Sequence, residues 1–155
     1  MDLVNKSNYK IILGSGSSRR SELLGMTGIN FTVNSISVDE SFPDFLQGAE
    51  ISKHIVKNKS DAFNDLIKKN EIIITADTLV WFKNQCLGKP KDKKEAKYML
   101  QLFAGKSHDV ITSVGFLTTN MFKILTESTT VTYKQKSFIL KLKLLRTTVE
   151  EVLDV

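Results

Sequence analysis

The chain has 155 residues, of which 41% are hydrophobic and 25% charged, values typical of one soluble globular domain. Its single cysteine, Cys86, excludes an intrachain disulfide and a zinc site built from cysteines. The N-terminal residues do not resemble a secretory signal, and no apolar run approaches the ~20 residues of a membrane span. We therefore expect a cytoplasmic protein without membrane contact. The net charge of +5 and the pI near 9.3 favour anionic partners, with nucleotides, nucleic acids and acidic lipids all open.

The first predicted elements are a strand, a loop and a helix. Residues 9–13 form a β-branched apolar run, which ends at the small residues Gly14 to Ser18, and residues 19–24 have a helical pattern. Ser17 or Ser18 can cap this helix, and Glu22 is placed for a capping box. The pattern predicts a strand–loop–helix unit with free backbone amides in its loop.

The following elements alternate between strand and helix patterns. In chain order we expect a short strand, a long helix, a buried strand, a hairpin, a helix and a pair of strands, at residues 31–35, 47–69, 71–76, 79–87, 92–103 and 109–133. A continuous apolar strand after a helix is typical of a buried parallel sheet, so the predicted class is α/β. Residues 134–155 differ, because lysine and leucine alternate densely there, and we predict one domain over residues 1–133 followed by an atypical basic and apolar tail.

The loop before the first helix is a candidate anion site. Its backbone N–H groups and the positive end of the helix dipole face the same way, and Arg19 and Arg20 add donors that suit phosphate oxygens. The segment matches neither the P-loop nor the dinucleotide-binding fingerprint. A tight turn followed by two solvated arginines remains the structural alternative.

Several polar residues elsewhere are candidates for chemistry on a phosphate. Asp77 follows the apolar strand at its predicted carboxyl end, where a carboxylate can hold a divalent metal or accept a proton from water, and Thr78 extends this cluster. Lys89 stands between a glycine and a proline that would aim its ammonium group. Glu40 could supply a second carboxylate and Lys59 lies on the long helix, although each of these residues could also be a solvated surface group.

Five short motifs occur in an order that is specific to one known family. They are IILGSGSSRRSELL at 11–24, ISVDE at 36–40, IIITADTLV at 72–80, LGKP at 87–90 and AGKSHDVITSV at 104–114. Over residues 10–133 the chain therefore resembles the Maf family of nucleoside triphosphate pyrophosphatases. The resemblance implies a Maf/ITPase-like α/β fold, in which an elongated mixed sheet is flanked by helices and a nucleotide cleft lies at the centre.

The resemblance also implies a reaction and its residues. Family members hydrolyse a nucleoside triphosphate between the α and β phosphates, giving a monophosphate and pyrophosphate, with a divalent cation such as Mg²⁺ or Mn²⁺. Asp77 matches the family's proton acceptor, and Asp77 with Glu40 would hold the metal. The positions that match substrate contacts are Ser15, Arg19, Arg20, Lys59, Thr78 and Lys89. The residues at positions 19 and 78, Arg19 and Thr78, resemble those of the family branch that acts on dTTP and UTP. We therefore expect dTTP, UTP or modified pyrimidine nucleotides as substrates.

Two other interpretations stay open. One is a C-terminally shortened family member that binds a nucleotide or a partner without turnover. The other is a small basic nucleic-acid-binding module, which only the charge supports, because no aromatic residues are interleaved on a basic face. We therefore expect a nucleoside triphosphate and no nucleic acid as the partner, and the resemblance is compatible with a homodimer. His54 and His108 are predicted to be structural.

The C-terminal end departs from the family pattern. The family continues with an Asp-Lys-Ala-Gly-Gly motif and a glutamine, whereas the chain contains neither, so its C-terminal portion is expected to be atypical or missing. One hypothesis for residues 134–155 is a frameshift, an alternative splice or a gene-model error. Glu150, Glu151 and Val152 can be encoded by GAG GAG GTN, which contains two glycine codons in a shifted frame.

Overall fold

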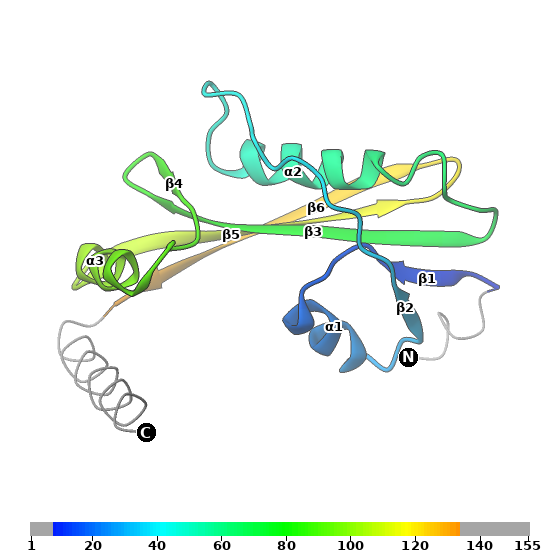
Figure 1. The fold of residues 1–155 in the computed structure, drawn as a ribbon, viewed down its shortest axis with the longest axis horizontal. Helices are drawn as coiled ribbons and strands as arrows, with labels where there is room; N and C mark the ends of the chain where they lie inside the picture. The colour runs from blue at the N-terminus through cyan, green and yellow to red at the C-terminus, as the bar shows by residue number, and fades with distance from the viewer. Residues whose placement is uncertain (1–7, 134–155) are drawn as a thin grey trace. The chain divides into compact units, whose positions relative to one another are not determined.

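The computed structural model describes residues 8–133 (Figure 1), so the predictions for residues 134–155 lie outside the described part. The described elements are β1 (Lys10–Leu13), α1 (Ser18–Gly25), β2 (Phe31–Val33), α2 (Ala49–Asp61), β3 (Glu71–Phe82), β4 (Gln85–Leu87), α3 (Lys93–Phe103), β5 (Ser107–Leu117) and β6 (Phe122–Thr132). No helix among the described residues is long and apolar enough to cross a membrane.

The strands form a mixed sheet in the order β2-β1-β3-β5-β6, with β4 paired to β3 outside this path. β1 pairs in parallel with both of its neighbours, and the Cα of Leu13 lies opposite Val33 on β2 and Ile74 on β3. β3 and β4 are antiparallel, with Trp81 opposite Cys86. The predicted α/β class with a mixed sheet and flanking helices is therefore confirmed.

The described residues form two compact units. The first contains residues 8–79 and 111–128, and the second contains residues 80–110 and 129–133. One domain over residues 1–133 stays a prediction.

The first unit holds the larger core. Phe63, Ile73 and Leu117 are buried together, and further apolar side chains pack against them. In Figure 1, α2 runs alongside β3 and β6 on one side of the sheet, and α1 lies on the other side near β1 and β2. α1 has no buried side chain, whereas α2 buries Ile51, Ser52, Ile55, Val56 and Ser60.

Two local predictions in the first unit are wrong. α2 ends at Asp61 rather than near residue 69, because Phe63 turns into the core, where it is 2% exposed, and short turns replace the helix. The predicted capping box at α1 does not form: Ser17 is the N-cap but its side chain makes no capping hydrogen bond. The glutamate of a capping box belongs three residues after the cap, and here that position is Arg20, whose side chain turns back to Ser15.

The second unit is built around a hairpin and a helix. Lys83 and Asn84 both have positive φ, at 50° and 61°, as the type I′ two-residue β-hairpin turn requires. α3 begins at Lys93, one residue after the predicted start, and Asp92 is its N-cap, because the Asp92 carboxylate accepts a hydrogen bond of 2.7 Å from the Glu95 backbone N–H. The buried ring of Phe103 packs against Phe82, His108 and Tyr133, and His108 also stacks on Tyr133.

Candidate functional site

Asp77 lies in the middle of β3, not at the end of a strand as predicted. The strand continues to Phe82 because residues 77 to 82 keep an extended backbone, and Val80 to Phe82 pair with β4. Alternate residues Ile73, Thr75, Asp77 and Leu79 are all buried, so Asp77 projects from the same face of β3 as two core side chains. A carboxylate in this place is held by a rigid strand interior rather than by a mobile turn.

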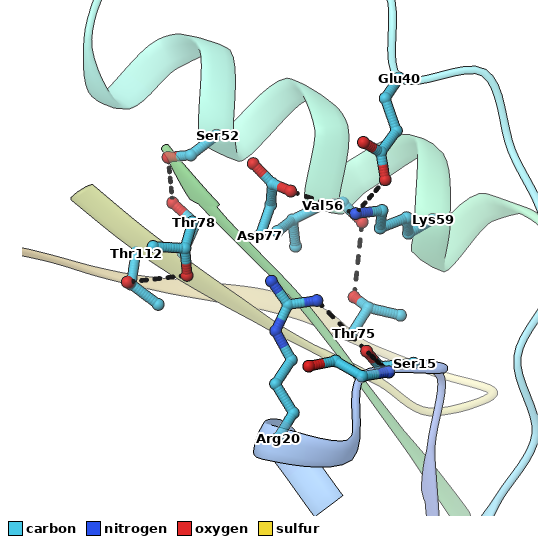
Figure 2. A network of polar contacts seen from close by, with 12 residues as sticks. Ser15, Arg20, Glu40, Ser52, Val56, Lys59, Thr75, Asp77, Thr78 and Thr112 are labelled. Carbon is cyan, nitrogen blue, oxygen red and sulfur yellow. Dashed lines mark hydrogen bonds and ion pairs between the residues drawn. The ribbon is translucent and has the colours of Figure 1, made fainter. Parts of the chain in front are cut away.

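Lys59 on α2 connects two carboxylates. Its Nζ lies 3.1 Å from Asp77 Oδ1 and 2.7 Å from Glu40 Oε1 (Figure 2). The side chains of Lys59 and Asp77 are only 13% and 11% exposed, whereas that of Glu40 is 59% exposed. The Lys59–Asp77 contact is therefore an ion pair largely shielded from water, in which the lysine balances the charge of a buried carboxylate.

The loop between β1 and α1 lies beside this part of β3. The Gly14 backbone N–H donates to the Ile74 carbonyl at 2.8 Å, and an added Cβ on Gly14 would lie 3.0 Å from Thr75 Cγ2. Ser15 is buried, and its Oγ accepts hydrogen bonds from the Ser17 backbone N–H at 3.3 Å and from Arg20 Nη1 at 3.2 Å. The sheet thus places the small-residue loop next to the segment that carries Asp77, and the serine fixes the Arg20 guanidinium.

Thr78, the neighbour of Asp77, faces the other side of β3 and is exposed. Its Oγ1 lies 3.0 Å from Thr112 Oγ1 on β5, so the two hydroxyl groups form a pair at the surface of the first unit. Thr78 was predicted as a site residue, whereas Thr112, although it lies in the motif at 104–114, was not, because a threonine within an alternating strand pattern has no distinctive chemical signature.

The remaining predicted residues are not part of these contacts. Arg19 is exposed at the start of α1. Lys89 is exposed in the segment after β4, in the second unit, so its place in the site stays a prediction. Asp39, the acidic neighbour of Glu40, is turned to Ser41, and hydrogen bonds from the side chain and backbone of Ser41 lower the pKa of the Asp39 carboxyl.

Buried hydroxyl pairs between α2 and the sheet were not predicted. Ser60 Oγ lies 2.7 Å from Thr75 Oγ1, and Ser52 Oγ lies 2.7 Å from Ser113 Oγ, which in turn lies 2.8 Å from Thr126 Oγ1. Ser52 and Ser60 are eight residues apart and share one helix face. This spacing is the sequence feature that could have revealed the contact.

The carboxylates fit a divalent metal that is shared with a substrate. Oxygen atoms of Glu40 and Asp77 converge on one cationic nitrogen, which shows that both can reach a single positive charge. Among residues 8–133 no group of three or more His, Cys, Asp or Glu side chains is arranged to hold a metal alone. Mg²⁺ is commonly held by one or two carboxylates together with substrate phosphates and water, and this donor set is of that kind.

Comparison with known proteins connects the chain to one sequence family. A sequence profile described as "Maf-like protein" matches residues 10–147. A protein of Flavobacterium psychrophilum named dTTP/UTP pyrophosphatase is 44% identical over 130 residues, which are 84% of this chain and 67% of the relative. A protein of the same name from Bacteroides thetaiotaomicron is 42% identical, over 84% of this chain and 68% of the relative. The chain thus spans about two thirds of the length of these relatives.

Solved structures with a similar fold have little sequence in common with the chain. The Ham1 protein of Staphylococcus aureus gives a TM-score of 0.53 at 16% identity, over 78% of this chain and 70% of that protein. A nucleoside triphosphatase (dITP/XTP pyrophosphatase) of Mycobacterium abscessus gives a TM-score of 0.54 at 10% identity, over 81% of this chain and 75% of that protein. These similarities support the expected fold type.

Proposed function

Because the chain belongs to the Maf family, we propose that it is a nucleoside triphosphate pyrophosphatase that acts on dTTP, UTP or related pyrimidine nucleotides of the cytoplasmic pool. The reaction would release a nucleoside monophosphate and pyrophosphate. The observation that supports this most directly is the buried Lys59–Asp77 ion pair, because it holds a carboxylate at a defined place beside a loop suited to phosphate.

Asp77 is the proposed proton acceptor. A water molecule would attack the α-phosphorus, a new P–O bond would form, and the bond from that phosphorus to the bridging oxygen would break. Asp77 would take the proton that the attacking water loses, and the bridging oxygen would leave with pyrophosphate. Lys59, hydrogen-bonded to Asp77 Oδ1, orients the carboxylate for this transfer.

The basic residues would bind the phosphates. The Ser15 contact holds the Arg20 guanidinium, whose fork of N–H donors suits phosphate oxygens, and Arg19 adds charge at the helix start. Lys89 is a further proposed phosphate contact, on the basis of its LGKP motif alone. Thr78, supported by Thr112, is the proposed contributor to the choice of pyrimidine nucleotide.

Glu40 and Asp77 would hold Mg²⁺ or Mn²⁺ together with the phosphates. When bound, the cation supplies electrostatic stabilisation of the negative charge that develops on the leaving pyrophosphate. For Lys59 this implies that Glu40 exchanges its contact with the ammonium group for the cation, while the contact of Lys59 with Asp77 Oδ1 stays in place.

A family member that binds nucleotide without turnover is the less favoured alternative. The deciding experiment uses the purified 155-residue chain with Mg²⁺ and measures pyrophosphate release from dTTP, UTP, CTP and 7-methyl-GTP. We expect cleavage of dTTP and UTP, and a loss of at least about 100-fold in kcat for Asp77→Asn. The matched control is Asp61→Asn, which removes an exposed carboxylate paired with Lys57 and should leave kcat unchanged. A folded chain that cleaves none of the four nucleotides would overturn the proposal, and full activity in Asp77→Asn would refute the role of Asp77.

A further inference from the structure

One buried hydrogen bond joins α2 to β3 next to the Lys59–Asp77 ion pair. Ser60 and Thr75 are 0% exposed, their hydroxyl oxygens lie 2.7 Å apart, and Thr75 also donates to the Val56 carbonyl oxygen at 3.4 Å. Lys59 directly precedes Ser60 on the helix, and Asp77 stands two residues after Thr75 on the same strand face. The hydroxyl pair is thus a buried hydrogen bond between α2 and β3 that lies within two residues of the ion pair on both elements.

The helix lies close to the sheet around this contact. An added Cβ on Gly115 would stand 2.7 Å from Val56 Cγ1 and 2.9 Å from Thr75 Oγ1. A Cβ on Gly14 would stand 3.0 Å from Thr75 Cγ2. The Thr75 side chain therefore lies close to the backbone of both Gly14 and Gly115, where a larger residue would crowd it.

The Lys59–Asp77 ion pair depends on the distance between α2 and β3. At 3.1 Å, the Lys59–Asp77 contact is a hydrogen bond, and a displacement of about 1 Å would exceed the distance at which such bonds form. Small displacements of this size are known to reduce catalytic rates strongly, because reacting groups must be held in a narrow geometry.

We propose that Thr75 is a positioning residue, which through its hydrogen bond to Ser60 sets the distance between Lys59 and Asp77. The consequence for turnover rests on the proposed function, whereas the effect on the ion pair does not. Thr75 acts through other residues and needs no contact with the substrate.

A second hydroxyl contact between the same helix and the sheet provides the matched control. Ser52 and Ser113 are also 0% exposed and 2.7 Å apart, but Ser52 lies seven residues before Lys59, at the opposite end of α2. Ser113→Ala removes a buried hydroxyl pair from the same interface without changing the contact beside Lys59. It should lower stability but leave the ion pair and the kcat within about twofold of the parent.

The first experiment measures the ion pair by stability alone. A double-mutant cycle with Lys59→Met and Asp77→Asn gives the coupling between the two residues, from urea unfolding, in the parent, in Thr75→Val and in Ser113→Ala. The coupling is the factor by which the Lys59–Asp77 interaction changes the unfolding equilibrium constant. We expect this factor to fall at least about fivefold in Thr75→Val and to persist in Ser113→Ala. If Thr75→Val does not fold, Ser60→Ala replaces it, because the Thr75 hydroxyl then still donates to the Val56 carbonyl oxygen. An unchanged coupling in the Thr75→Val or Ser60→Ala background would overturn the proposal.

The second experiment measures turnover. We expect Thr75→Val to lower kcat at least about tenfold while KM for dTTP changes less than twofold, and Thr75→Ser, which retains the hydroxyl, to restore most of kcat. An equal loss of kcat in Thr75→Val and Ser113→Ala would show that only general packing is involved and would refute a positioning role. If the parent chain cleaves no nucleotide, the proposed function fails, yet the coupling measurement still decides the role of Thr75.

Discussion

Gly115 on β5 offers a quantitative test of how closely α2 lies against the sheet. In Gly115→Ala the new Cβ would stand 2.7 Å from Val56 Cγ1, 2.9 Å from Thr75 Oγ1 and 3.1 Å from Phe122 Cε2. Carbon atoms in contact are normally about 3.5 to 4.0 Å apart, so the backbone of α2 or β5 would have to move by roughly 1 Å. The three atoms belong to side chains, but Val56 and Thr75 are β-branched and fully buried, so they have little rotamer freedom with which to move aside.

The cost of such overpacking is typically about 1 to 3 kcal/mol of unfolding free energy. For a chain of this length each kcal/mol corresponds to about 2 to 4 °C, so Tm should fall by about 2 to 12 °C. Urea unfolding and thermal melting, both followed by circular dichroism, measure the two quantities. Turnover should fall as well, because a displaced α2 carries Lys59 away from Asp77.

Gly25→Ala is the control for the same chemical change. Its Cβ would meet no atom within 4 Å, and alanine near the end of α1 should leave stability unchanged or raise it by up to about 1 kcal/mol. If Gly115→Ala is as stable as the parent, or if Gly25→Ala loses as much stability, the close approach of α2 to the sheet is not a constraint on the fold.

Two further predictions concern a buried histidine and an arginine. His108 is 7% exposed, and burial lowers the pKa of its ring below the ordinary value, although the Asp109 carboxylate acts in the opposite direction. The unfolded chain therefore binds the His108 proton more readily than the folded chain. The unfolding free energy should fall as the pH drops below the ordinary pKa of histidine, by at most about 1.4 kcal/mol per pH unit. His108→Phe should remove this contribution. Urea titrations from about pH 8 to about pH 5 test it, and an identical slope in the variant would contradict it. Arg20→Lys keeps the positive charge but removes the guanidinium group that donates to Ser15. The KM for dTTP should therefore rise about tenfold, which corresponds to the loss of one charge-assisted hydrogen bond. The increase should be larger than in Arg19→Lys. Steady-state kinetics measure both, and equal effects would show that the Ser15 contact is unimportant.

Local patterns were sufficient to predict most of the elements. The apolar run before Gly14 and the helical spacing after it predicted β1, the loop and α1, and the polar Lys83 and Asn84 predicted the hairpin turn. Prediction from the sequence failed where tertiary contacts override the local secondary-structure preference. Asp77 and Thr78 look like strand-ending residues, yet β3 continues through them because one faces α2 and the other faces solvent.

The site was predicted as separate residues and not as a set of contacts. Glu40, Lys59 and Asp77 each came from a different motif or helix, and nothing in their spacing showed that one ammonium group contacts both carboxylates. Thr75 and Ser60 were missed for another reason. Serine and threonine usually indicate exposed positions, and their burial becomes apparent once the strand and helix faces are known.

The two carboxylates that contact Lys59 have different mechanical support. Asp77 belongs to the interior of a twelve-residue strand, whereas Glu40 lies in residues 34–48, which form neither helix nor strand. Amide hydrogens around Asp77 should exchange with solvent only through large-scale unfolding, while those around Glu40 should exchange through local opening. Glu40 can therefore leave Lys59 through a local rearrangement, but Asp77 cannot move without disrupting the sheet. An incoming ligand would therefore meet a carboxylate that can adjust its position, Glu40, and one that is fixed, Asp77.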